Sequence, residues 1–183
     1  MYVAGETTYY RRLQVLLELS AAHKPRTCDR LIEHITEKSP PNFVYHRWDA
    51  EKRDIVGRCS VGAIRRTIAI ASELGLLDSS TGALTRIGKE AADPARFERL
   101  IRNQLTTHFD RLGCAVSSIA ETSRRLLHSR KISLPTADEL YANLFTAKES
   151  SLAASRFRTL LQLLAACGGI GTSRRQIFLP VGE

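Results

Sequence analysis

The residues in this chain that could do catalytic chemistry lack the spacing that catalysis needs. A metal-dependent nuclease would want Asp…Glu-x-Lys in a strand context, and Trp48–Asp54 (WDAEKRD) holds acids and a lysine without that spacing. The glycine-rich stretch 168–173 (GGIGTS) has no following Lys and no preceding strand, unlike a phosphate-binding loop. Five histidines share no motif with a Ser, a Cys or a carboxylate pair: His23, His34, His46, His108 and His128. We therefore expect neither enzyme activity nor a cofactor.

The cysteines give no sign of a metal centre. Cys28, Cys59, Cys114 and Cys167 lie 31, 55 and 53 residues apart, and no CxxC or His-spaced pair accompanies them. A structural zinc site normally uses ligands in close pairs. We expect no metal, and we interpret the four thiols as small buried residues of a reducing compartment.

The charge of the chain favours a polyanionic partner. The formal net charge is +8, with 14 Lys and Arg against 11 Asp and Glu in residues 1–92 and 13 against 8 in residues 93–183. The surplus is thus spread over both halves. Arg supplies 21 of the 27 cations, and its planar guanidinium suits phosphates and base edges better than Lys does. Basic composition alone does not identify nucleic acid, but it raises that expectation.

No stretch of the sequence has the length and apolar content of a membrane-spanning segment. No window approaches the roughly 20 apolar residues that span a bilayer, and the N-terminus (MYVAGETTYYRRLQ) lacks an apolar signal region. We expect a cytoplasmic protein without a membrane partner, associated with the nucleoid if it binds DNA.

Apolar residues at helical spacing predict a mainly α chain. Capping residues indicate where several of these helices begin. The expected N-caps are Thr8, Thr27, Ser60, Thr85 and Ser150, and Thr136 with Glu139 is expected to form a capping box. We expect helices over residues 7–22, 28–38, 61–74, 86–92, 94–109, 112–128, 137–145 and 151–167. The stretch 39–58 has no regular pattern and holds the only Trp; a short helix within it is one option.

Two short hairpins are expected after the third and the last of these helices. Gly75 is placed to end a helix, and residues 76–78 and 83–85 flank the turn-rich tetrapeptide SSTG. Near the C-terminus, Ile170 and residues 177–180 flank GTSRRQ, whose tip is basic. Residues 131–134 alternate like a short strand.

Helix, short strand, helix, helix and hairpin is the order of a winged helix-turn-helix domain. Residues 60–91 (SVGAIRRTIAIASELGLLDSSTGALTRIGKEA) resemble its recognition helix, the Gly-Leu-Leu turn into its wing and the Leu-Thr-x-x-Gly-Lys-Glu exit seen in many bacterial and archaeal members. The resemblance implies tandem domains, over residues 1–92 and 112–183, joined by a connecting helix over 93–111. The stretch 39–58 is longer than the usual turn before a recognition helix.

The resemblance also implies where DNA would bind. A recognition helix reads the major groove with a few side chains, and the outer face of the third helix offers small residues for close approach and arginines for contact: Arg58, Ser60, Gly62, Arg65, Arg66 and Ala69. The corresponding residues of the second copy and its wing are Ser151, Ser155, Arg158, Gln162, Arg174 and Arg175. Each face has an alternative interpretation as a solvated helix surface, and the second also as a face packed on a partner.

The run Tyr9 to Arg12 has two interpretations. Its rings and arginines could contact nucleic acid, or one ring could belong to the core while the arginines are solvated. We expect a non-catalytic protein that binds double-stranded DNA, as a transcription regulator or as a subunit of a larger complex. The alternative is a winged-helix subunit that docks a larger enzyme or a defence or replication machine. A protein partner or a homodimer is compatible with either.

Overall fold

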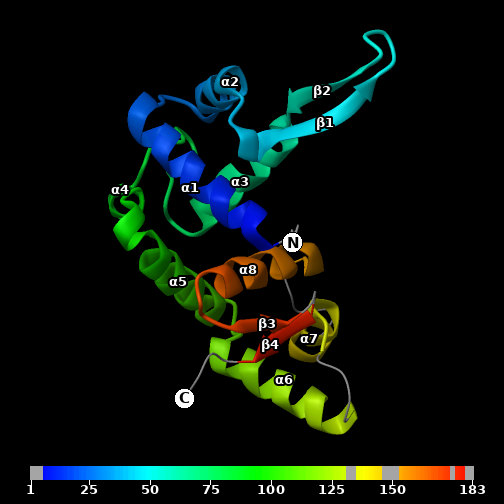
Figure 1. Ribbon diagram of the computed structural model, residues 1–183. Coiled ribbons are helices and arrows are strands. Elements are labelled where there is room, and N and C mark those ends of the chain that lie inside the picture. The colour runs from blue at the N-terminus through cyan, green and yellow to red at the C-terminus, as the bar shows by residue number, and fades with distance from the viewer. Residues whose placement is uncertain (1–5, 131–134, 146–152, 174–175, 180–183) are drawn as a thin grey trace. The chain divides into compact units, whose positions relative to one another are not determined.

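The chain is mainly helical, with two small antiparallel sheets of two strands each in the part that is described (Figure 1). The computed structural model describes residues 6–130, 135–145, 153–173 and 176–179. The helices are α1 (Glu6–His23), α2 (Cys28–Lys38), α3 (Val61–Glu73), α4 (Arg86–Ala91), α5 (Pro94–Arg111), α6 (Val116–Arg130), α7 (Ala137–Leu144) and α8 (Ala154–Ala166). The strands are β1 (Val44–Asp49), β2 (Asp54–Cys59), β3 (Gly171–Ser173) and β4 (Gln176–Leu179), and a short 3₁₀ helix covers Pro41–Phe43. The expected mainly α chain with small hairpins is confirmed.

The chain forms two compact units, which are described separately below. One comprises residues 8–100, and the other comprises residues 101–183 together with 1–7. The boundary falls inside α5, so this helix contributes residues to both.

Local capping sets where most helices of the first unit begin. The side chains of Thr27, Ser60 and Thr85 accept hydrogen bonds from the third N–H of α2, α3 and α4, respectively, at 3.0–3.2 Å. These N-caps satisfy amide groups that would otherwise lack a partner inside the helix. The three predicted caps are therefore confirmed. Thr8, by contrast, lies within α1, which begins at Glu6.

The core of the first unit is formed by the inner faces of α1, α2, α3 and the start of α5. Tyr10 meets Phe97 edge to face, with ring centroids 5.0 Å apart. The fully buried large side chains are Leu13, Leu16, Leu17, Leu31, Ile35, Phe43, Ile64, Ile70, Leu76 and Phe97. One ring of the Tyr9–Arg12 run is thus a core contact.

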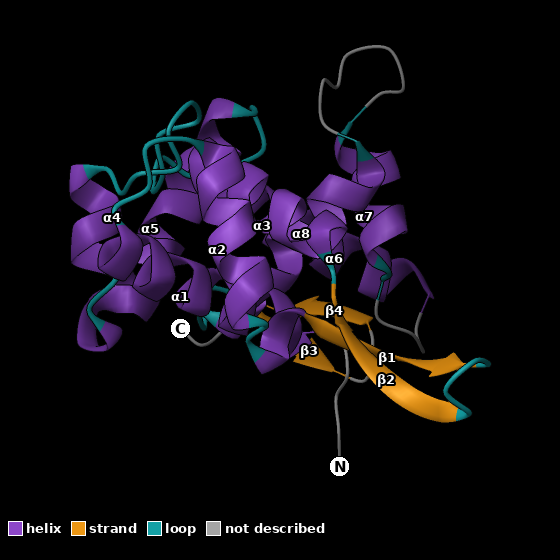
Figure 2. Ribbon diagram, turned by 90° about the horizontal axis from the view of Figure 1, so that it is seen from above, coloured by secondary structure: helices purple, strands orange, loops and turns teal. Residues whose placement is uncertain are grey.

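Residues 39–58 form a β-hairpin that the sequence pattern does not reveal. Pro40 and Pro41 end the α2 segment and start the 3₁₀ turn, after which β1 and β2 pair in register from Val44–Cys59 to Asp49–Asp54. The Ser60 N–H donates to the Phe43 carbonyl at 2.8 Å and closes the base of the ribbon. The ribbon, which we call the arm, extends beyond the helices of its own unit (Figure 1, Figure 2).

The expected hairpin around SSTG is reduced to a single antiparallel bridge, Leu77 to Leu84. The Asp78 N–H donates to Ala83 and the Thr85 N–H donates to Leu76, at 2.9 and 3.0 Å. The predicted two-stranded wing is therefore present only in part, as this one bridge. The turn between its two segments is closed by Asp78 Oδ1, which accepts hydrogen bonds from the N–H and the hydroxyl of both Ser80 and Thr81. Gly75 ends α3 with a φ of 68°, as expected.

The second unit has the order α6, α7, α8 and the β3–β4 hairpin. α7 lies against both α6 and α8, and β4 lies against α6. Thr136 and Glu139 form the predicted capping box, with reciprocal bonds of 2.8 and 3.2 Å. Its fully buried apolar side chains, among the described residues, are Ile101, Leu105, Phe109, Ile119, Leu140, Phe157, Leu160, Leu161, Leu163, Leu164 and Cys167.

Two predicted helix starts in this unit are wrong. The helix expected from Leu112 begins at Val116. Gly113 adopts a φ of 70°, which is not a right-handed helical conformation, so the chain turns there between α5 and α6. The helix expected from Ser150 begins at Ala154, and its N-cap, Ala153, has no side-chain hydrogen bond. The predicted strand 131–134 and the expected cap Ser150 lie outside the described residues.

Candidate nucleic-acid interface

α3 separates an apolar face from a polar face along its whole length. Ala63, Ile64, Thr67, Ile68, Ile70 and Ala71 are buried. Residues on the opposite side are exposed: Gly62, Arg65, Arg66 and Ala69. The inner positions recur at three and four residues, which is the spacing that places side chains on one side of a helix. The predicted outer face of this helix is therefore the solvent face.

Two exposed guanidinium groups stand on that face between small residues. Within the described part of the chain, neither Arg65 nor Arg66 forms an ion pair. Arg66 Nε donates to the carbonyl of Gly62 at 3.2 Å. Apart from the backbone of its own helix and its two chain neighbours, no atom of the described residues lies within 4 Å of the position that a Cβ on Gly62 would take. A ligand can therefore approach the backbone of α3 closely at its N-terminal end.

A third arginine, Arg12 of α1, lies close to this face. Its Nε donates to the carbonyl of Asn42 at 2.7 Å, and its guanidinium lies 5.7 and 5.8 Å from the ring centroids of Tyr9 and Phe43. Burial lowers the pKa of Arg12, and the positive charge of Arg66 lowers it further. Tyr9 has the opposite effect and raises this pKa. Arg remains protonated at any physiological pH, so Arg12 adds positive potential beside Arg66.

Arg12 is not among the residues that the sequence predicts for the interface. The one sequence feature that points to it is the aromatic and basic run Tyr9–Arg12. The run cannot say which of its arginines faces α3, because that depends on how α1 crosses α3. A tertiary contact settles the choice: Arg12 reaches the loop that leads into the arm.

Arg58 and Ser60 have structural partners at the junction of the arm and α3. Arg58 is exposed and lies 3.5 Å from the carboxylate of Asp49. Ser60 is the N-cap of α3. Arg58 is thus only loosely paired, whereas the Ser60 hydroxyl is engaged by the helix that it caps.

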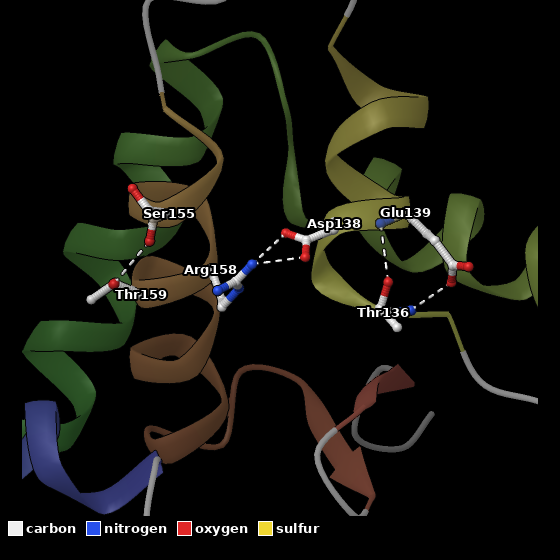
Figure 3. A network of polar contacts seen from close by, with 6 residues as sticks. All are labelled: Thr136, Asp138, Glu139, Ser155, Arg158 and Thr159. Carbon is white, nitrogen blue, oxygen red and sulfur yellow. Dashed lines mark hydrogen bonds and ion pairs between the residues drawn. The ribbon is translucent and has the colours of Figure 1, made fainter.

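The predicted second face lies on α8, and its arginine is already paired. Arg158 Nη2 lies 2.7 Å from both carboxylate oxygens of Asp138 and so joins α8 to α7 (Figure 3). Ser155 is exposed and Gln162 is half-buried. The ion pair cancels the one positive charge among the described residues of this predicted set. Ser151, Arg174 and Arg175 lie outside the described residues.

The described residues contain few other candidate sites. No three His, Cys, Asp or Glu side chains among them gather as metal ligands would. None of the four cysteines forms a disulfide; Cys114 and Cys167 are buried, and Cys28 and Cys59 are half-buried. None of the helices in the described ranges has the length and apolar content to cross a membrane. Comparisons with protein-family models, curated proteins and solved structures found no significant match for this chain.

Proposed function

We propose that this chain binds double-stranded DNA without catalysis, through the outer face of α3. The observation that carries the proposal is the pair of exposed arginines, Arg65 and Arg66, which form no ion pair with the described residues. They stand beside exposed Gly62 and Ala69 on a helix whose other side is core. Guanidinium groups supply phosphate contacts and bidentate contacts to guanine. Small neighbouring residues let the helix backbone approach the groove.

Arg12 supports this assignment from a different element. It places a third cation next to Arg66, and its bond to the Asn42 carbonyl fixes it relative to α3. A face on which two segments converge with positive charge is more selective for a polyanion than incidental arginines along one helix.

The proposed architecture is a pair of winged-helix domains, as the resemblance implies. The α6–α7–α8–hairpin order of residues 101–183 agrees with that architecture, and β4 lies against α6 as a wing strand would. The unit of residues 8–100 departs from it in two ways. Its wing is one bridge, Leu77–Leu84, and a long arm replaces the turn between α2 and α3.

Protein docking is the second candidate, and one contact favours it for residues 101–183. The Arg158–Asp138 pair leaves α8 with a face that is polar and less basic. Such a face suits a protein partner better than DNA. In this view the first unit would hold DNA and the second would dock a larger complex.

The test is fluorescence anisotropy with a labelled random duplex of roughly three helical turns, over a salt series from about 50 to 200 mM. We expect the affinity to fall with salt, with a log–log slope of about 0.9 per phosphate contact. The paired substitutions Arg65→Glu and Arg66→Glu should abolish binding. The matched control, Arg96→Glu with Arg99→Glu, makes the same charge change on the exposed side of α5 and should retain most of the affinity.

Binding that survives the α3 substitutions, or no binding by the unaltered chain at about 50 mM salt, overturns the proposal. Circular dichroism of each variant confirms that the fold is intact. Capture of a protein partner that is lost with the α3 variant would instead favour docking through this face.

A further inference from the structure

The arm carries an exposed apolar pair that its own fold leaves uncovered. Trp48 and Ile55 are direct cross-strand partners, so their side chains share one face of the ribbon. Each has 61% of its surface exposed. An isolated two-stranded hairpin is only marginally stable in water. A large exposed apolar pair at such a position marks a contact with something else.

The surface around Trp48 suits the flat face of a nucleobase better than a bare phosphate. Trp48, Asp49, Ala50, Glu51 and Arg58 line a hollow of about 350 Å³. A phosphate would be repelled by the two carboxylates. A nucleobase, by contrast, is flat and uncharged and can stack on the exposed indole. Asp49 and Arg58 alternate with Trp48 and Ile55 along the strands, so they lie on the other face of the ribbon, where they pair with each other.

The tip of the arm also offers two exposed cations. Asp49 Oδ1 accepts the N–H groups of Glu51 and Lys52, and Asp54 Oδ1 accepts that of Ile55. The side chains of Lys52 and Arg53 are exposed and form no ion pair among the described residues. They are available to the phosphates on either side of a stacked base.

The position of the arm connects this hollow to α3. β2 ends at Cys59, and the next residue, Ser60, is the N-cap of α3. Six-residue strands reach about 20 Å. The arm therefore extends from the N-terminal end of the helix proposed to hold a duplex.

We propose that Trp48, supported by Ile55, stacks an unpaired base, so that the DNA ligand is a duplex adjoining unpaired bases. This inference rests on the proposed function of α3. Bases inside an intact duplex have both faces covered by their neighbours, so only an unpaired base can present the face that the indole matches. α3 holds the duplex portion, and the arm reaches the base beside it.

The test uses the intact chain and the fact that Trp48 is its only Trp. Its emission is followed while two duplexes of equal length are added, one fully paired and one with a short single-stranded gap. The gapped duplex should quench Trp48 and bind about tenfold more tightly, the effect of roughly one base–aromatic stack. The fully paired duplex should bind without quenching.

Variants separate the arm from α3. Trp48→Ala should remove the preference for the gap, measured by anisotropy of labelled DNA, and leave the affinity for the paired duplex unchanged. Trp48→Phe is the matched control, because it keeps an aromatic face and should retain most of the preference. Both changes are at an exposed position, so the fold is expected to tolerate them.

Failures of the two proposals have different signatures. A gap preference that persists in Trp48→Ala, or gapped DNA that leaves Trp48 emission unchanged, overturns the role of the arm and leaves the role of α3 intact. Retained binding of both duplexes by the Arg65→Glu, Arg66→Glu variant overturns the role of α3. Concentration-dependent shielding of Trp48 without DNA, accompanied by dimers in sedimentation, would assign the arm to self-association and overturn the inference.

Discussion

Arg158 of α8 and Asp138 of α7 are joined by an ion pair in which one guanidinium nitrogen lies 2.7 Å from both carboxylate oxygens. Both side chains are more than half exposed, at 51% and 60%. The pair therefore links two helices at the surface of their unit, where water competes for both charges. The pair neutralises Arg158 and so leaves the exposed face of α8 less basic.

A double-mutant cycle with Arg158→Ala and Asp138→Ala should give a coupling energy of about 0.2–1 kcal/mol. Water screens the attraction, and holding two long side chains costs entropy, so a larger value is not expected. Urea denaturation of the four proteins provides the measurement. A coupling near zero would show that the pair does not form in solution, and one above about 2 kcal/mol would show that it is desolvated.

Gly88 of α4 packs against the backbone of the turn after α3. A Cβ at this position would overlap the carbonyl oxygen of Leu76 and would also lie 3.2 Å from Leu84 Cδ2. The Leu76 oxygen is backbone and cannot move aside cheaply. Gly88→Ala should thus destabilise the first unit by roughly 1–3 kcal/mol. Gly62→Ala is the control, since its Cβ would meet open space, and it should change stability by less than about 1 kcal/mol. Equal effects of the two substitutions would contradict this account.

Asp78 organises the SSTG turn only while its carboxylate is ionised. Hydrogen bonds from the Ser80 hydroxyl, the Thr81 N–H, the Thr81 hydroxyl and the Ser80 N–H hold the pKa of Asp78 well below its ordinary value of 3.8. A lowered pKa gives stability that is present above the ordinary value and lost as the pH falls toward the folded value. Asp78→Ala should therefore be less stable than the unaltered chain at neutral pH, and the difference should shrink below about pH 4. A difference that does not change with pH would show that the turn does not depend on the charge.

Cys114 should remain a protonated, unreactive thiol over the neutral range. It is 2% exposed, and burial raises its pKa to about 11 from an ordinary value of 9.0. Above the ordinary value the unfolded thiol ionises while the folded one does not, so stability is lost as the pH rises from 9.0 toward 11. The loss is about 1.4 kcal/mol per pH unit.

The Cys114→Ala variant should not show this loss of stability between pH 9.0 and 11. Chemical denaturation of both proteins across this pH range measures the difference. Alkylation at neutral pH should modify the half-buried Cys28 and Cys59 before Cys114. Rapid modification of Cys114 in the folded chain would contradict its burial.

The predicted interface was only partly accessible from the sequence. The outward direction of Gly62, Arg65, Arg66 and Ala69 follows from helical periodicity, because the apolar residues between them can satisfy only one buried face. The charge state of the α8 face does not follow from its own sequence, since it depends on Asp138 some 20 residues away in another helix. The sequence shows that Trp48 is the only Trp of the chain, but it does not show that the side chain is exposed.

The sequence by itself determined most of the helices and four of their N-terminal caps. Thr27, Ser60, Thr85 and the Thr136–Glu139 box act on amides three residues away, so local composition is sufficient to place them. The arm was decided by tertiary structure. Alternation of apolar and polar residues marks a strand only when one of its faces is buried, and β1 and β2 expose residues on both faces. The turn at SSTG follows from its residue types, and the hydrogen bonds that Asp78 Oδ1 accepts close it, but how far the flanking segments pair, at one bridge only, was decided by the tertiary structure.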